Sequence, residues 1–98
     1  MPVYVIARMK IHDRKGYDRY EDGFMPVFEK FDGKMLSVDE DPTILQGEWN
    51  HTRSVLIEFP DKKSAYAWMT SPEYQEIARH RLAASEGESI LVQGIEAE

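Results

Sequence analysis

The sequence predicts a single α+β domain in which strands and helices follow one another in the order β-α-β-β-α-β. Two observations support this class: strand-like apolar runs at 3–11 and 53–59, and apolar residues at helical spacing over 17–31 and 74–82. The 98 residues have the length of one domain. The chain contains no internal repeat, low-complexity segment or linker, so we expect one domain over residues 1–98.

The first strand is expected over residues 3–11, with odd-numbered residues on one face and even-numbered residues on the other. Asp13 is a suitable N-cap for the helix that follows. The inward stripe of that helix is mainly aromatic and consists of Tyr17, Tyr20, Phe24, Val27, Phe28 and Phe31. Pro26 lies inside the pattern and predicts a kink or a restart, and Gly33 predicts the end of the helix.

The segment "GKMLSVDE" (33–40) is typical of a more polar strand near a sheet edge. Residues 41–52, "DPTILQGEWNHT", are expected to form a loop or an irregular hairpin, and residues 53–59 form the third strand. Asp61 caps a short helix that carries Ala65, Trp68 and Met69.

The second helical region is expected in two pieces, because Ser71 and Pro72 give the N-cap and first position of a new helix. The inward face of this helix is predicted to consist of Tyr74, Ile77, Ala78, Arg81 and Leu82. Gly87 is expected to end the helical region. The last strand is expected in "ESILVQGIEA" (88–97), with Gly94 at a bulge or a close approach.

This element order corresponds to the ferredoxin-like fold, in which both helices cover one face of the sheet. We expect the first and third strands to be central, adjacent and parallel. The other sheet face is apolar as well, since Tyr4, Ile6, Leu56, Ile90 and Val92 lie in the opposite phase. Large apolar patches are rare on soluble monomers, so the sequence predicts a homodimer whose two sheets stack into an α/β barrel.

Composition excludes several classes of partner and site. The formal net charge of −6 argues against nucleic acid and anionic membranes as partners. The basic triplet Arg79-His80-Arg81 is interpreted as the C-terminal half of a helix, where positive charge is favourable. Without cysteine there is no disulfide, thiolate metal site or thiol nucleophile. No membrane span or signal peptide is legible, so we expect a cytoplasmic location.

The sequence resembles the dimeric α/β-barrel superfamily, and within it a bacterial family of unknown function, DUF1330. The resemblance covers nearly the whole chain, and the residues that carry it are "YVIARMKIHD", Tyr17 and Tyr20, "LQGEWNHTRSVLIEFPD", "SAYAWMTSPEYQEIARHR" and "ILVQG". It implies the fold and a homodimer but no established reaction. The wider superfamily includes cofactor-free monooxygenases, muconolactone isomerases, haem proteins and stress-response proteins, and fold alone does not choose among them.

One carboxylate is unexpected, because Glu58 interrupts the buried strand "SVLIEFPD". With parallel central strands, Arg8 and Glu58 would meet near the strand ends, on the sheet face away from the helices. Glu58 would then be a general base, and Arg8 would hold an anion or enolate in an apolar space lined by Tyr4, Ile6 and Leu56. The alternative is a structural ion pair at the dimer interface.

The histidines and one tryptophan are weaker candidates. His12 lies at the same strand end as the expected pair and is a possible proton shuttle. His12, His51 and His80 lack metal-ligand spacing, although any of them could ligate haem. Trp49 could close a cavity mouth or cover a partner subunit.

The leading functional hypothesis is a cofactor-independent enzyme that acts by proton transfer or oxygenation on a small, partly apolar molecule. Its site would lie between sheet and helices or between two sheets, with Glu58, Arg8 and His12 as catalytic residues and no cofactor or metal. The alternatives are a ligand-binding or stress-related module without turnover, and a haem binder.

Overall fold

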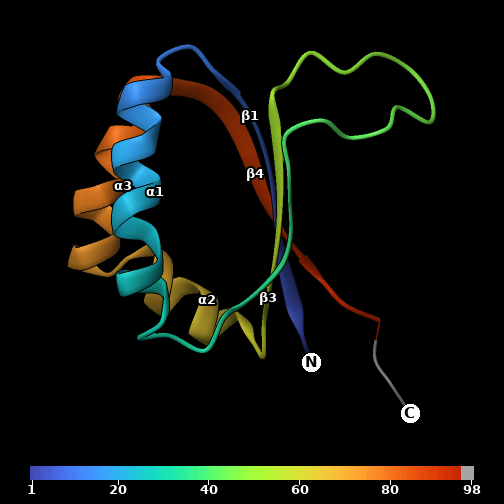
Figure 1. Cartoon of the computed structure of the whole chain (residues 1–98). Coiled ribbons are helices and arrows are strands. Elements are labelled where there is room, and N and C mark those ends of the chain that lie inside the picture. The colour runs from blue at the N-terminus through green and yellow to red at the C-terminus, as the bar shows by residue number, and fades with distance from the viewer. Residues whose placement is uncertain (96–98) are drawn as a thin grey trace.

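A computed structural model of the protein describes residues 1–95 and shows two layers, a four-stranded sheet and a layer of helices. The elements are β1 (Val3–Ile11), α1 (Arg14–Phe28), β2 (Lys34–Asp39), β3 (Arg53–Phe59), α2 (Lys62–Met69), α3 (Pro72–Ala84) and β4 (Ser85–Gln93). Helices α1 and α3 lie side by side on one face of the sheet, and α2 lies at the lower end of the same layer in Figure 1. The predicted ferredoxin-like order, including the divided second helix, is confirmed.

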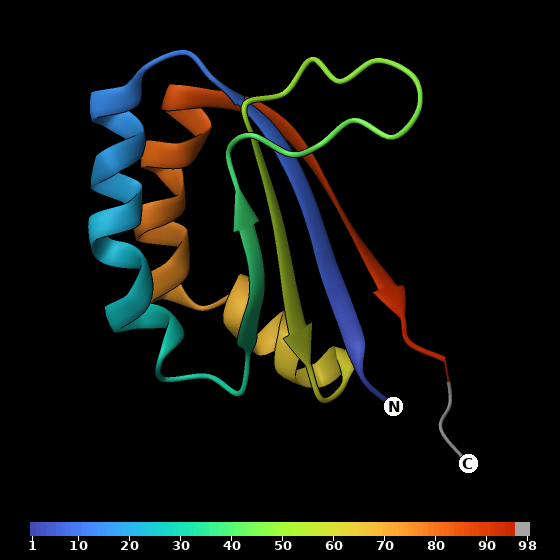
Figure 2. The ribbon, with the colours of Figure 1, turned by 45° about the vertical axis from the view of Figure 1, so that its right-hand side comes forward.

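The strand order is β2-β3-β1-β4, and every neighbouring pair is antiparallel. The prediction of parallel central strands is therefore wrong. The connection through α1 brings the chain back so that β2 runs parallel to β1, one strand away from it. The link between β2 and β3 then reverses the direction, and β3 has to run antiparallel to its neighbour β1 (Figure 2).

The three helices begin at the predicted N-caps. The side chains of Asp13, Asp61 and Ser71 accept hydrogen bonds from backbone N–H groups three residues later, at 3.2, 2.8 and 3.1 Å. Helix α1 continues through Pro26 and ends at Phe28, so the predicted restart does not occur. Pro26 has no N–H to donate to the carbonyl of Asp22, so the last turn of α1 lacks one backbone hydrogen bond.

The core lies between the two layers and is rich in aromatic side chains. Phe59 is fully buried, and its ring lies 6.0 Å from that of Phe28 and 5.5 Å from that of Trp68, measured between centroids. The inward face of β1 contributes Val3, Val5 and Met9. The predicted inward and outward faces of β1 are therefore correct. On α3, Leu82 is exposed, contrary to prediction.

Two glycines sit where the backbone has no room for a side chain. Gly87 lies inside β4 instead of ending the helical region, and a Cβ atom there would come within 2.6 Å of the carbonyl oxygen of Arg8. At Gly94, the backbone N–H donates to the carbonyl of Pro2 at 2.8 Å, and a Cβ would lie 2.9 Å from the Tyr4 ring. The predicted close approach at Gly94 is confirmed.

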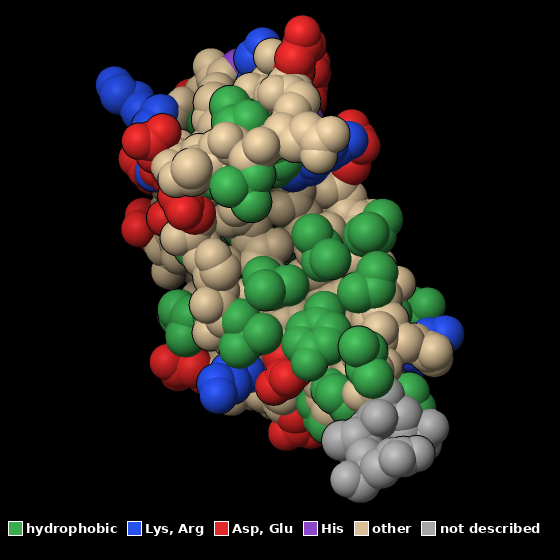
Figure 3. Space-filling model, turned by 90° about the vertical axis from the view of Figure 1, so that its right-hand side faces the viewer, with side chains coloured by type: hydrophobic (Ala, Val, Ile, Leu, Met, Phe, Trp, Pro, Cys, Tyr) green, Lys and Arg blue, Asp and Glu red, His purple; other side chains and the backbone are tan. Residues whose placement is uncertain are grey.

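The sheet face away from the helices is open, and its centre is apolar (Figure 3). The strand registers place Tyr4, Ile6, Leu56, Ile90 and Val92 on this face, which we call the open face. The connection between β2 and β3 projects on the same side of the sheet (Figure 1) and exposes Ile44 and Leu45. A large apolar surface of this kind is characteristic of a protein interface.

The cap of α3 yields a stability prediction. The buried Ser71 hydroxyl donates to the carbonyl of Trp68 at 2.9 Å and accepts from the N–H of Tyr74. Ser71→Ala should lower the free energy of unfolding by about 1–2 kcal/mol, measured by urea denaturation. Ser37→Ala, at an exposed position on β2, is the control and should stay within about 0.5 kcal/mol of wild type. Equal effects of both changes would contradict the role of this cap.

Candidate functional site

The structure does not bring Arg8 and Glu58 together. In the antiparallel register Arg8 lies opposite Ser54, and Glu58 lies opposite Tyr4. Four residues of strand separate the two positions, which corresponds to about 13 Å. Both side chains do face the open side of the sheet, so the predicted face is correct and the predicted pairing is wrong. The error follows from the assumed parallel direction of β3.

Each member of the expected pair has another neighbour. The guanidinium of Arg8 donates to Glu88 at 2.9 Å on the neighbouring strand, and both side chains are about half exposed or more. Glu58 lies beside Tyr4 and raises the pKa of the Tyr4 hydroxyl, mainly through a side-chain hydrogen bond. The unexpected carboxylate in β3 is therefore part of the polar border of the open face, together with Lys34, which lies opposite it on β2.

The remaining predicted site residues lie away from the interior of the domain. His12 is exposed where β1 leads into α1. Trp49 and His51 lie in the connection between β2 and β3, with ring centroids 5.0 Å apart. None of these, nor His80, lines the cavity described below, and Tyr4, Ile6 and Leu56 belong to the open face. Whether the open face encloses a second site in a dimer remains a prediction.

A cavity of about 530 Å³ lies between the helices and the inner face of the sheet. Its walls are mostly apolar or aromatic and include Val5, Phe24, Met35, Val55, Ile57, Trp68 and Tyr74. Met25 on α1 and Val38 on β2 also line it and are each about half exposed, so the cavity opens between α1 and the β2 edge. This volume and lining are those of a small-molecule site.

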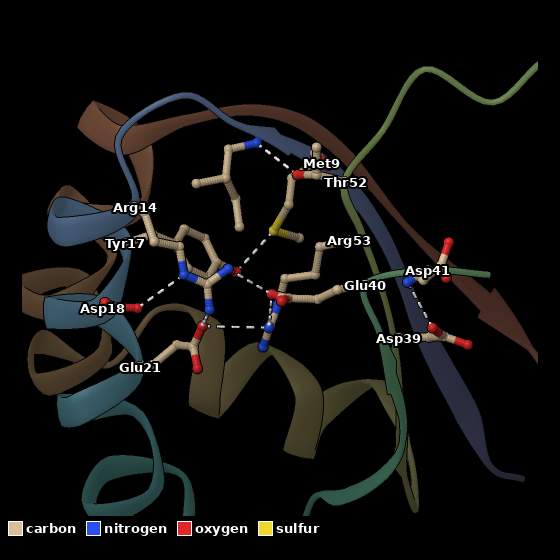
Figure 4. Close-up of polar contacts among 11 residues, drawn as sticks. Met9, Arg14, Tyr17, Asp18, Glu21, Asp39, Glu40, Asp41, Thr52 and Arg53 are labelled. Carbon is tan, nitrogen blue, oxygen red and sulfur yellow. Dashed lines mark hydrogen bonds and ion pairs between the residues drawn. The ribbon is translucent and has the colours of Figure 1, made fainter.

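Arg53 is the buried charge of this cavity, with 9% of the residue exposed (Figure 4). Its Nη1 donates to Glu40 at 2.9 Å and to Glu21 at 3.4 Å. Arg14 contacts the same two carboxylates, at 2.9 and 3.2 Å. The guanidinium of Arg53 also lies 5.2 Å from the centroid of the Tyr17 ring, a cation–π arrangement. Two arginines and two glutamates thus form a cluster linked by a network of ion pairs at one end of the cavity.

The two glutamates of the cluster differ in how tightly they are held. Glu40 makes both of its contacts at 2.9 Å, and the hydrogen bond from Arg14 is the main cause that lowers the pKa of Glu40. The same contact raises the pKa of Arg14. Glu21 makes only the two longer contacts and lines the cavity, whereas Glu40 does not. Glu21 is therefore the carboxylate available to a ligand.

Three tyrosines add neutral hydroxyl groups to the interior. The Tyr17 hydroxyl donates to the sulfur of Met9 at 2.9 Å, and the hydroxyls of Tyr20 and Tyr74 are hydrogen-bonded at 2.9 Å. Burial raises the pKa of Tyr17 to about 12 and raises that of Tyr20 further. The hydroxyls of Tyr17 and Tyr20 therefore stay protonated at neutral pH.

The sequence contains a signal for the two charged residues Glu21 and Arg53, which the sequence-based prediction of the site missed. Glu21 follows Tyr17 by four residues and precedes Phe24 by three, so it lies on the aromatic stripe of α1. Arg53 opens a strand in the same phase as the inward Val55 and Ile57. A charge placed within an apolar face is the usual sign of a site.

Residues 1–95 were also compared with the requirements of a metal site and of a membrane-spanning helix. Within residues 1–95, no group of three or more His, Asp or Glu side chains is arranged to hold a metal ion. None of the helices described is both long enough and apolar enough to cross a membrane.

The family described as "Domain of unknown function (DUF1330)" matches residues 2–95, nearly the whole chain. The chain belongs to the DUF1330 family. The resemblance read from the sequence is thus confirmed, and no curated protein matches this DUF1330 chain.

Solved structures place this DUF1330 protein among ferredoxin-like proteins. RPA0582, a protein of unknown function from Rhodopseudomonas palustris, is 19% identical with a TM-score of 0.82, over 98% of this chain and 84% of that one. SnoaB from Streptomyces nogalater, a cofactor-independent oxygenase, is 16% identical with a TM-score of 0.66, over 98% and 95%. A dimeric ferredoxin-like protein from Jannaschia sp. CCS1 is 13% identical with a TM-score of 0.70, over 96% and 100%. At these identities the likeness establishes the fold alone.

The buried tyrosines predict a loss of stability at high pH. Because the folded-state pKa of Tyr17 is raised from 10.0 to about 12, the folded protein retains a proton that the unfolded chain loses in this range. The contribution of Tyr17 to stability is therefore constant below pH 10 and falls as pH rises from 10 to 12, by about 3 kcal/mol. Tyr17→Phe should reduce this fall in the free energy of unfolding between pH 10 and pH 12, measured by urea denaturation at several pH values. The exposed Tyr66→Phe is the control, and an equal effect there would contradict the assignment.

Proposed function

We propose that the cavity between the helices and the sheet is the active site of a cofactor-independent enzyme that acts by proton transfer or oxygenation on a small, partly apolar, oxygen-bearing molecule. The observation that carries this proposal is the placement of one buried arginine and one loosely held glutamate at the same end of a mostly apolar cavity. An apolar enclosure strengthens the interaction of such groups with a reacting molecule.

The first step would be removal of a proton from carbon. The Glu21 carboxylate takes a proton from a carbon next to a carbonyl group, and the electron pair of the broken C–H bond moves to the carbonyl oxygen. Arg53 stabilises the enolate oxygen that forms, because its guanidinium is fixed in a water-poor environment. The tyrosine hydroxyls nearby remain neutral and do not compete as anions.

Two outcomes are available to the enolate. Returning the proton from Glu21 to a different carbon gives an isomer, with no change in oxidation state. Alternatively, molecular oxygen adds to the carbanion carbon and gives a hydroperoxide after protonation. Loss of water from this hydroperoxide leaves a new carbonyl group, so that one CH₂ and one O₂ become one C=O and one H₂O. The substrate supplies all four electrons in this second route, and no cofactor is required.

The fold neighbours are compatible with this proposal. SnoaB is a cofactor-independent oxygenase with the same fold, although 16% identity carries no site residue over to this chain. A module that binds a ligand without turnover remains the main alternative, and loss of the Glu21 carboxylate separates the two. The haem hypothesis finds less support, because none of the histidines in residues 1–95 lines the cavity.

We also propose that the protein is a homodimer joined through the open face. The apolar centre of this face consists of side chains from three strands, and the helices of the same chain cover only the opposite face. Structural neighbours include proteins described as dimeric and ferredoxin-like, from Jannaschia and from Bacteroides fragilis. In such a dimer Arg8 and Glu58 would border the apolar centre as separate residues, which favours a structural role for each of them over a catalytic pair.

The catalytic proposal predicts that Glu21→Gln abolishes proton transfer without loss of binding. Benzoylacetone, a partly apolar 1,3-diketone, is a suitable probe, with exchange of its CH₂ protons in D₂O followed by NMR. We expect wild type to accelerate this exchange above background, and Glu21→Gln to reduce the acceleration roughly 100-fold or more. Binding, followed through protein NMR shifts, should change only a few-fold.

The control for this experiment is Glu29→Gln, an exposed carboxylate that follows the same helix. It should retain the wild-type rate. Exchange by Glu21→Gln at the wild-type rate would show that Glu21 is not the base. Binding without any acceleration by wild type would favour the module without turnover.

The dimer proposal predicts that a charge on the open face separates the subunits. Ile90→Arg, at a position with 58% exposure, should weaken association at least roughly 100-fold, because two unpaired cations would be buried per dimer. The control is Leu82→Arg on α3, at 65% exposure on the helical side, which should remain dimeric. Sedimentation velocity over a concentration series is the measurement. A folded wild-type protein that sediments only as monomer would refute the dimer.

A further inference from the structure

The cavity contains hydrogen-bond donors for which the described residues offer no acceptor. The Nε atoms of Arg53 and Arg81 and the indole Nε1 of Trp68 are each buried without a hydrogen-bond partner in residues 1–95. All three side chains line the cavity. Buried donors without partners cost stability unless something else satisfies them. Since the unsatisfied groups are all donors, the missing component is an acceptor.

Arg81 differs from the other arginines of the structure's interior. Arg53 has two carboxylates within 3.4 Å, whereas no carboxylate of residues 1–95 forms an ion pair with Arg81. The guanidinium of Arg81 lies 5.9 Å from the centroid of the Tyr20 ring, which supports its charge without neutralising it. Arg79, two residues earlier, is exposed and paired with Glu76 at 2.8 Å. The inward arginine of the basic triplet is thus the unpaired one.

The two cavity arginines occupy different places along the aromatic wall. Arg53 lies over Tyr17, and Arg81 lies over Tyr20, whose ring centroid is 5.4 Å from that of Tyr17. The ring of Trp68 lies 4.3 Å from that of Tyr74, the hydrogen-bonded partner of Tyr20, so its indole belongs to the same aromatic wall. A ligand in the cavity therefore meets the Glu21–Arg53 cluster at one place and Arg81 at another.

The charge of the lining has the opposite sign to that of the protein. Glu21, Arg53 and Arg81 are the charged side chains of the lining, which gives +2 − 1 = +1, within a chain of formal net charge −6. An acidic protein that keeps an unpaired arginine in an apolar cavity is suited to an anionic ligand.

We infer that the substrate of the proposed enzyme is a partly apolar acid whose carboxylate binds Arg81, while its reactive carbonyl group lies against Glu21 and Arg53. This inference rests on the proposed function and deepens it, because it assigns the chemical class of the substrate. The carboxylate satisfies the buried Nε donor of Arg81, and the apolar body of the ligand packs on the aromatic walls.

The test compares 2-naphthoate with 2-naphthamide, two probes of nearly equal shape that differ in charge. Trp49→Phe leaves Trp68 as the single tryptophan of the chain, so the indole N–H signal in an NMR spectrum reports on the cavity and not on the connection between β2 and β3. We expect 2-naphthoate to shift this signal and to bind at least roughly tenfold more tightly than 2-naphthamide. Arg81→Gln, in the same background, should remove the preference.

The matched control is Arg79→Gln, which changes the same charge on the same helix outside the cavity and should keep the preference. Equal affinities for the two probes in the Trp49→Phe protein would overturn the inference even if Arg81→Gln failed to fold. A preference that survives in folded Arg81→Gln would overturn it as well, and so would the absence of any shift with either probe. The proposed function is judged separately, because benzoylacetone is uncharged and its exchange does not require Arg81.

Discussion

The buried guanidinium of Arg53 is the constraint on which the interior of this domain depends. A cation with 9% exposure has to be compensated, and the compensation comes from α1 and from the residue that follows β2. Glu21 and Glu40 therefore converge on β3 from two different elements. Arg14 completes the cluster and keeps the glutamates from repelling each other. The charged side chains of the cluster lie between the helices and the sheet at this end of the domain. Apolar side chains therefore cannot fill the space there.

This arrangement divides the inner face of the sheet into two regions. Around Phe59, the rings of Phe28 and Trp68 pack at centroid distances of 6.0 Å or less and leave little space. Toward Arg53, the wall includes the longer and more adaptable side chain of Met9, which lies opposite Arg53 on β1, and the cavity extends to this end. The helix layer thus both packs against the sheet and encloses the cavity. The aromatic stripe of α1 carries one carboxylate, that of Glu21, and this charge keeps part of the space from being filled by apolar side chains.

The sequence predicted the element order, the N-caps and the two faces of the sheet correctly, since these depend on local chemistry and on periodicity. It failed for the partner of Glu58, because one wrong strand direction moves a contact by the length of a strand even when the face is right. Arg53 and Glu21 were missed for a different reason. Each lies at a position of its helix or strand that faces the interior, but a single charged residue in an amphipathic pattern is easily taken for a solvent-exposed one. The two are recognised as a pair by their proximity, and the proximity is known only once the fold is known.

The two apolar faces of the sheet are shielded from water in different ways. The open face has no cover within the chain, and its borders carry charges that remain exposed, such as Arg8 with Glu88, so it is suited to a partner that excludes water from its centre only. The inner face is already enclosed, and its polar groups are buried donors or members of a closed cluster. A small domain that keeps a cavity gives up packing energy, and burial of the open face in a dimer would offset this loss. Dimerisation and ligand binding would then be coupled through the stability of the domain, although they use opposite faces of the same sheet.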